Sequence, residues 1–191
     1  MSTPVETLTK IIKERRSIFP ASYIKKEIPK TIIEQILESA NYAPTHKLTQ
    51  PWRFVVIRKD AKAKLGTELG DIYKQTIPAE KFMQKKYESF TEKTDQADCI
   101  IAINIQFSGK IAEWEEIAAV ACAVQNMALT AETLNVGAYW SSPPLITQLG
   151  DFLSLAENEK CFGLFYMGYH NELPRAAHRT PIEEKVKWLE K

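Results

Sequence analysis

The sequence predicts an α+β fold, and three observations support this prediction. Three short runs, Trp52–Arg58, Asp98–Phe107 and Cys161–Tyr169, are rich in the β-branched and aromatic residues that favour buried strands. Segments with apolar residues at helical spacing lie before, between and after these runs. The 191 residues contain no repeat, low-complexity run or linker, so we expect a single domain over residues 1–191.

The first two elements are expected to be helices. In Pro4–Arg16 apolar residues recur every three or four positions, and Thr3 can cap the helix ahead of its proline. Lys30–Tyr42 repeats this apolar spacing and predicts a second helix. Ala43–Pro51 then predicts a loop, bounded by proline near each end, that leads into the strand Trp52–Arg58.

The middle of the chain predicts more helix around the second strand. Lys59–Phe90 is charged and helical in pattern, with Pro78 as a break between two helices. After the strand Asp98–Phe107, a long helix is predicted over Trp114–Leu134. Alanines give this helix a small, apolar surface wider than one stripe, which indicates packing on more than one side. We therefore expect it to pack against its copy in a homodimer.

The last third is expected to contain shorter elements. Ala138–Ser142 predicts a short strand that ends at two prolines, and Leu145–Leu155 predicts a helix. The third strong strand, Cys161–Tyr169, is followed by a final short helix over Ile182–Trp188.

Composition excludes several classes of protein. The formal net charge of +1 offers no broad attraction for nucleic acid or anionic lipid. The amino-terminal segment has charges throughout and no apolar core, unlike a secretory signal. The most apolar stretch, Ile117–Trp140, is interrupted by polar residues and so predicts a buried helix instead of a membrane span. We expect a cytoplasmic protein with no nucleic-acid or membrane partner.

The three cysteines, Cys99, Cys122 and Cys161, lie far apart in apolar surroundings. Without CxxC spacing they predict reduced core thiols, and neither a disulfide framework nor a metal site.

Two clusters in the amino-terminal third can bind a ligand. If the first helix ends at Arg15, then Arg15, Arg16 and Ser17 can converge on a phosphate; otherwise they form a basic helix end that complements the helix dipole. The loop sequence APTHKLTQPW is stiffened by its prolines and offers His46 and Gln50 beside a strand. Such a loop suits hydrogen bonding to a planar heterocycle, although a solvated surface turn is the alternative.

Two further segments are candidates in the carboxy-terminal half. In AYWSSPP, Trp140 with Ser141 and Ser142 can line a ligand, or the tryptophan can belong to the core. Arg175 and Arg179 form a basic cluster that can bind an anion or lie in solvent.

Common catalytic motifs are missing from the sequence. It contains no GxGxxG, GxxxxGK[ST], GxSxG, HExxH or paired CxxC motif. We find binding groups but no evident acid, base or nucleophile, and we assign no catalytic side chain. This pattern is typical of a protein whose cofactor carries out the chemistry.

Taken together, these segments resemble the nitroreductase family of flavoproteins. The RRS triplet, the segment APTHKLTQPWRFVVI, the helix AAVACAVQNMALTAETLNVGAYW and the tail FGLFYMGYHNELPRAAHRTPIEE occur in the family's order over nearly the whole chain. The proline loop is most similar to small single-domain members with an APxHK–QPW loop. The resemblance implies a mixed β-sheet flanked by helices around a long central helix, in an intertwined homodimer.

The resemblance also implies one FMN-binding domain, with FMN bound between the subunits. Arg15, Ser17 and Arg179 would hold the phosphate, and Arg16 would reach the ring or the ribityl chain. The partner subunit would supply Tyr42, His46 and Gln50, and the isoalloxazine would lie along Trp140, Ser141 and Ser142.

Three positions depart from the family pattern. Tyr42 stands where related members can have arginine, and Ser141 replaces a longer side chain. Pro143 and Pro144 stand where glycine is common, and prolines offer no N–H, so the group that meets flavin N5 is left open.

The activity implied by the resemblance is that of an FMN-dependent oxidoreductase. NADH or NADPH would reduce the flavin, and a flat, electron-poor acceptor such as a nitroaromatic or a quinone would then be reduced in a ping-pong cycle. Lys59–Phe90 would be a substrate lid whose lysines recognise an acidic substrate, or simply a solvated helical pair. A non-catalytic FMN-binding protein, for flavin storage or redox sensing, is the alternative function.

Overall fold

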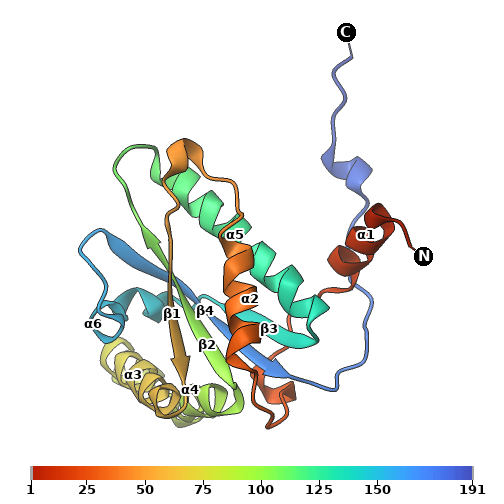
Figure 1. The fold of residues 1–191 in the computed structure, drawn as a ribbon. Helices are drawn as coiled ribbons and strands as arrows, with labels where there is room; N and C mark the ends of the chain where they lie inside the picture. Colours follow the sequence, from red (N-terminus) through yellow and green to blue (C-terminus); the bar gives the residue numbers. More distant parts are fainter. Residues whose placement is uncertain (1, 191) are drawn as a thin grey trace.

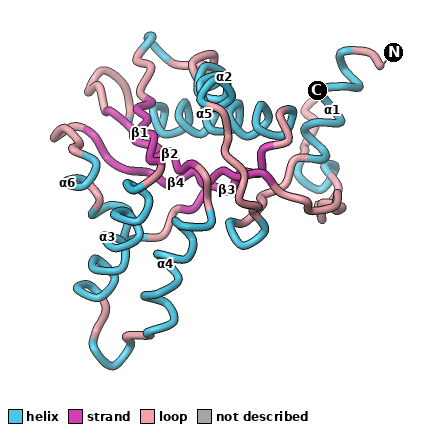
Figure 2. Tube along the Cα trace, turned by 60° about the horizontal axis from the view of Figure 1, so that its bottom comes forward, coloured by secondary structure: helices cyan, strands magenta, loops and turns pink. Residues whose placement is uncertain are grey.

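A computed structural model describes residues 2–190, and its centre is an antiparallel sheet between two layers of helices (Figures 1 and 2). Within these residues the four named strands pair in the order β1-β2-β4-β3, and every pair is antiparallel. The strands are β1 (Trp52–Arg58), β2 (Cys99–Gln106), β3 (Val136–Ser141) and β4 (Glu159–Tyr169).

The strand directions follow from the connections. Two helices, α3 (Asp60–Thr76) and α4 (Gln84–Gln96), join β1 to β2, so the chain enters β2 in the reverse direction. The expected mixed sheet is therefore antiparallel in its named strands. Among the described residues, parallel pairing occurs in an isolated bridge between Ser17 and Ala138, at the edge of the sheet formed by β3.

Each face of the sheet buries its own core. Alternate residues of β2, from Cys99 to Ile105, face α2 (Lys30–Ala40) and the long helix α5 (Glu113–Thr133). Ile100 and Ala102 face the opposite layer, which contains α3, α4 and the short α6 (Gly150–Leu153). Figure 2 shows these two layers on either side of the strands.

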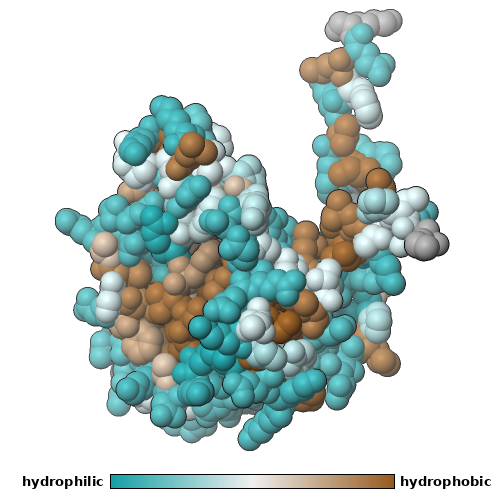
Figure 3. Space-filling view, viewed as in Figure 1, coloured by the Kyte–Doolittle hydropathy of each residue, from teal (hydrophilic) through white to brown (hydrophobic). Residues whose placement is uncertain are grey.

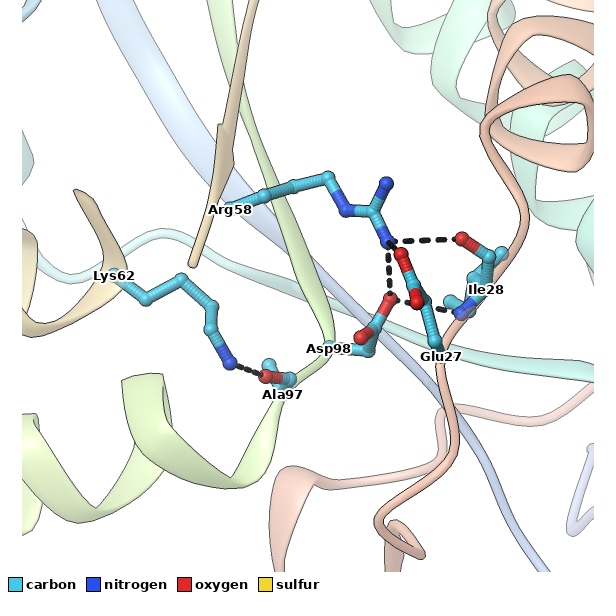
Figure 4. Close-up of polar contacts among 6 residues, drawn as sticks. All are labelled: Glu27, Ile28, Arg58, Lys62, Ala97 and Asp98. Carbon is cyan, nitrogen blue, oxygen red and sulfur yellow. Dashed lines mark hydrogen bonds and ion pairs between the residues drawn. The ribbon is translucent and has the colours of Figure 1, made fainter. Parts of the chain in front are cut away.

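An ion cluster fastens the segment before α2 to the sheet (Figure 4). The Asp98 carboxylate accepts hydrogen bonds from the Ile28 N–H at 2.9 Å and from Arg58 Nη2 at 3.1 Å. Arg58 also contacts Glu27, and Lys62 donates to the Ala97 carbonyl at the same end of β2.

The first helix, α1 (Pro4–Glu14), confirms the expected cap at Thr3. The Thr3 hydroxyl accepts from the Glu6 N–H at 3.2 Å, and the Glu6 carboxylate accepts from the Thr3 N–H at 2.8 Å. None of the residues of α1 is buried, and the helix stands away from the body beside the carboxy-terminal arm, residues 171–190 (Figure 1).

The expected break at Pro78 between two helices is confirmed, but two other expected helices are shorter than predicted. Over Leu145–Leu155 the chain forms a 3-10 turn, Pro144–Gln148, and then α6, because the prolines and Gly150 interrupt a regular helix. Ile182–Lys185 is a single 3-10 turn, and the expected helix over Ile182–Trp188 is wrong. This segment is exposed and packs on nothing that would stabilise so short a helix.

The expectation of three core thiols is corrected at one position. Cys99 and Cys161 are buried, whereas Cys122 lies on the exposed face of α5. No helix within residues 2–190 is long and apolar enough to cross a bilayer.

Candidate functional site

The helical backbone of α1 ends where the triplet Arg15-Arg16-Ser17 begins. The Arg15 N–H still donates to the Ile11 carbonyl at 3.0 Å, but its own backbone is already extended, with φ −52° and ψ 127°. Because the helix ends at Arg15, the side chains of Arg15, Arg16 and Ser17 can reach one site. Arg15 and Arg16 are half-buried, and Ser17 is exposed.

The Arg16 guanidinium lies against the end of α1. Its Nη1 donates to the carbonyls of Lys13 at 2.6 Å and Arg15 at 2.8 Å. These bonds satisfy carbonyl groups that a helix end leaves free. Its Nε is buried and has no hydrogen-bond partner within the described part of the chain, so the group retains an unused donor.

Ser17 lies beside β3, and this contact joins the arginine triplet to the segment that contains Trp140. The Ile18 N–H donates to the Ala138 carbonyl at 3.0 Å within the parallel bridge between Ser17 and Ala138. Trp140 lies two residues further along β3, or about 7 Å at the usual rise of a strand. The triplet therefore lies beside the AYWSS segment.

The Trp140 indole lies across β4 at Gly163. A Cβ atom on Gly163 would stand 1.9 Å from Trp140 Nε1, so only glycine leaves room for the ring. The indole is 36% exposed and is therefore a surface for a ligand as much as part of the core.

Beside Trp140 is a hollow of about 370 Å³, called here the α4 hollow. Trp140, Ser141 and Ser142 line one side of it, and Lys86 and Lys93 of α4 line the other. Burial and the neighbouring Lys86 charge lower the pKa of Lys93. Tyr166 also lines the hollow, and burial raises the pKa of its hydroxyl.

The predicted proline loop is ordered by its own contacts. The Thr45 hydroxyl accepts from the Gln50 N–H at 3.0 Å, and Lys47, Leu48 and Gln50 adopt positive φ angles between 43° and 54°. His46 Nδ1 contacts the Glu115 carboxylate in the first turn of α5. Loops of this shape keep their conformation only where surrounding contacts hold them.

The loop lies far from the other clusters of the same chain. The loop that contains His46 lies at the amino-terminal end of α5, whereas Arg16 shares a hollow with Glu132 and Asn135 at its carboxy-terminal end (Figure 1). The 21 residues of α5 span about 30 Å. Within one chain the structure does not bring Tyr42, His46 or Gln50 to the triplet or to Trp140.

The carboxy-terminal arm returns to the triplet. Arg179, Arg16 and Lys13 line one hollow of about 420 Å³, although Arg179 lies 163 positions beyond Arg16 in the sequence. Arg175 Nη2 donates to the Ser17 carbonyl at 2.7 Å. The arm therefore adds positive charge to the end of α1.

Sequence reasoning named Arg175 in a basic cluster but gave it no contact, and it considered the lysines of Lys59–Phe90 only as part of a possible lid. It did not single out Lys86 or Lys93 as site residues. Lys86 and Lys93 are seven positions apart, a spacing that puts both on one face of a helix. This spacing is visible in the sequence, but the lysine face can be assigned to a site only when the fold shows that it shares a hollow with residues of β3.

The model of the Nitroreductase family matches residues 12–169. A curated relative from Bacillus subtilis (strain 168), "Putative NAD(P)H nitroreductase YfhC", is 28% identical over 93% of this chain and 92% of its own length.

Two solved structures have similar folds. The nitroreductase-like family protein from Bacillus cereus superposes with a TM-score of 0.84 at 25% identity and covers 100% of both chains. A Desulfovibrio desulfuricans protein, described as a putative nitroreductase in complex with FMN, has a TM-score of 0.71 at 26% identity and covers 97% of this chain and 96% of its own.

Proposed function

The chain belongs to the nitroreductase family, and we propose that it is an FMN-dependent NAD(P)H oxidoreductase that reduces flat, electron-poor acceptors such as nitroaromatics and quinones. The observation that carries this proposal is the bridge from Ser17 to Ala138, since it brings a cationic helix end beside the Trp140 surface. The names of the relatives support the same activity: one is called an NAD(P)H nitroreductase and another was solved with FMN.

The residues at the end of α1 fit an FMN phosphate. Arg15, Ser17 and Arg179 supply guanidinium and hydroxyl donors, the groups that bind phosphate with charge-assisted hydrogen bonds. The buried, unpartnered Nε of Arg16 is a donor in need of an acceptor, as expected beside the ring or ribityl chain of a bound cofactor.

The residues along β3 fit a flat ring. Trp140 presents a half-exposed indole, and Ser141 and Ser142 add hydroxyl groups at its edge. Bound FMN would supply the redox chemistry of a ping-pong cycle, with NADH or NADPH as the hydride donor and the flat acceptor as the oxidant. In this proposal the protein binds and orients the reactants and excludes water, and no side chain acts as acid or base.

The proposed site takes its second half from a partner subunit. Tyr42, His46 and Gln50 lie too far along α5 to join the triplet within one chain, but an antiparallel pairing of two copies of α5 would bring them to it. Apolar side chains exposed on α1 and on the carboxy-terminal arm suit such an exchange (Figure 3). Val5, at 74% exposed, and Trp188, at 79%, would then be covered by the partner.

The first test is the absorption spectrum of the purified protein, with the cofactor identified after denaturation. Flavin bands and about one FMN per chain are expected for a binding site of this kind. Anaerobic addition of NADH or NADPH should then bleach the flavin, and 4-nitrobenzamide or a quinone should restore it. Bound FMN that neither donor bleaches would favour a storage or sensing protein instead, and a chain that takes up no FMN would contradict the proposal.

The phosphate residues can be tested with a matched pair of variants in α1. Arg15→Gln should weaken FMN binding by roughly tenfold or more, since a charge-assisted hydrogen bond is lost. Lys10→Gln removes the same charge from an exposed position five residues earlier and should leave FMN binding within about twofold. Equal effects of the two changes would mean that only the overall charge matters.

A further inference from the structure

The two lysines of the α4 hollow lie on one face of α4, across the hollow from Tyr139 and Ser141 of β3. Lys86 and Lys93 line the same cavity as Ser141 and Ser142, and Lys86 Nζ lies 5.2 Å from the centroid of the Phe90 ring between them on the helix. Lys93 is half-buried. The cavity therefore has a wall on β3 with the Tyr139 ring and the serine hydroxyls, and a cationic wall on α4.

These charges lack a counterion in the described part of the chain. None of the described residues that line the α4 hollow is acidic, and neither ammonium group lies within 4.0 Å of a carboxylate in residues 2–190. By contrast, Arg58 and Lys30 each form an ion pair. Two cations in one partly buried cavity repel each other, and a bound anion removes that cost.

We propose that Lys86 and Lys93 bind an anionic substituent, such as a carboxylate, on the acceptor that the flavin reduces. The proposal rests on the function proposed above and narrows its substrate class to electron-poor aromatic or quinonoid acids. The acceptor ring lies beside Ser141 and Ser142, and its acidic group points toward α4. The lysines act on binding and orientation and take no part in electron transfer.

The test compares two acceptors of the same shape, 4-nitrobenzoate and 4-nitrobenzamide, with the FMN-loaded protein. The quantity measured is the ratio of their kcat/KM values. The ratio should favour the acid in the parent protein and fall as salt concentration rises. In Lys93→Met, and in Lys86→Met, it should drop by roughly tenfold, the size expected for one lost charge-assisted hydrogen bond.

The matched control is Lys85→Met, which removes an exposed α4 lysine that is absent from the lining of the hollow. It should preserve the parent ratio. If Lys85→Met lowers the ratio as much as Lys93→Met does, the effect is one of general charge and the proposal is overturned. A ratio that none of the three variants changes overturns it as well.

The same cavity could instead receive a phosphate of the nicotinamide donor or the flavin itself. A higher KM for NADPH in Lys93→Met, with an unchanged acid-to-amide ratio, would assign the lysines to the donor and overturn the proposal. A changed flavin spectrum or FMN affinity with an unchanged ratio would assign them to the cofactor, with the same consequence.

A binding measurement separates this proposal from the proposed activity. Ligand-observed NMR with benzoate and benzamide, which carry no reducible group, requires no turnover. Benzoate should show saturation transfer that Lys93→Met abolishes and Lys85→Met retains. This result supports the anion site even if NADH and NADPH fail to bleach a flavin, whereas equal binding of the two ligands by the parent overturns it.

Discussion

At the scale of single residues, Asp98 joins three parts of the chain at the start of β2. Its carboxylate accepts hydrogen bonds from the backbone before α2 and from Arg58 at the end of β1, and its side chain is only 22% exposed (Figure 4). An ion pair with this much burial and a backbone donor contributes more than an exposed pair does.

We therefore expect Asp98→Asn to lower the free energy of unfolding by about 1–2 kcal/mol, since two charge-assisted bonds are weakened. Urea unfolding monitored by circular dichroism measures the change. Glu34→Gln is the control, because it breaks the exposed pair with Lys30 and should cost less than about 0.5 kcal/mol. Equal losses in the two variants would show that burial adds nothing at Asp98.

The buried thiols predict how stability depends on pH. Burial raises the pKa of Cys161 to about 11 and that of Cys99 to about 12, from 9.0 for each ordinary thiol. Between about pH 9 and pH 11 the unfolded thiols lose protons that the folded thiols keep, so stability present below pH 9 is lost as pH rises. By pH 10, the ionisation of each thiol in the unfolded chain should lower the free energy of unfolding by about 1 kcal/mol.

Urea unfolding at intervals from pH 8 to pH 10 tests this expectation. The double variant Cys99→Ala, Cys161→Ala should be less stable at pH 8 but lose less stability on the way to pH 10. Burial also raises the pKa values of Tyr23 and Tyr166, whose ordinary value is 10.0, so their effect begins at higher pH. Parallel pH profiles for parent and variant would contradict the role given to the thiols.

At the scale of elements, two glycines set the distance between α3 and α4. A Cβ atom on Gly66 would lie 2.5 Å from Thr94 Oγ1 and 2.8 Å from Thr91 Cα, and one on Gly70 would lie 3.0 Å from the Tyr87 ring. They are four positions apart and so share one face of α3. This close approach positions α4, and with it the lysines of the α4 hollow.

Gly66→Ala should destabilise the protein by about 1–3 kcal/mol, because overpacking against the α4 backbone exceeds the gain of about 1 kcal/mol in helix propensity. The control is Gly150→Ala, where a Cβ atom meets nothing within 4 Å and stability should stay level or rise slightly. Urea unfolding of both variants measures the difference. A Gly66→Ala protein as stable as Gly150→Ala would show that α4 moves freely.

The sequence predicted best those elements whose own residues determine them. The bounds of β1 match the expected Trp52–Arg58, and the break at Pro78 lies where proline removes a hydrogen bond. The expected helix after Pro181 failed because a short helix depends on packing partners that its sequence does not reveal. Cys122 was placed in the core because the apolar content of α5 does not tell which face is covered.

At the scale of the whole molecule, the candidate site depends on neighbours that are distant in sequence. The triplet and the Trp140 segment were predicted separately, and the bridge between Ser17 and Ala138 that joins them is a product of the fold. Lys86 and Lys93 had the spacing of one helix face, but only the fold brings that face to the hollow that Ser141 and Ser142 also line. Local patterns thus identified the groups, and tertiary contacts decided which of them meet.

The exposed face of α5 provides the test of assembly. Trp114, Ala118, Ala121, Cys122 and Gln125 form an exposed stripe of mainly small and apolar side chains on the side away from the sheet. Such a stripe allows two helices to approach closely. If two copies of α5 pair there, the partner's proline loop reaches the arginine triplet. A substitution that prevents this pairing should therefore weaken both dimer assembly and FMN binding.

Ala121→Glu places a carboxylate in this proposed interface, where burying an unpaired charge is strongly unfavourable. The parent should sediment at twice its chain mass of 21.8 kDa at micromolar concentration, and the variant at the chain mass with weakened FMN binding. Ala63→Glu makes the same exchange at an exposed alanine of α3 and should remain a dimer with bound FMN. A monomeric parent that retains FMN would contradict the shared site, because Tyr42, His46 and Gln50 would then contribute nothing to it.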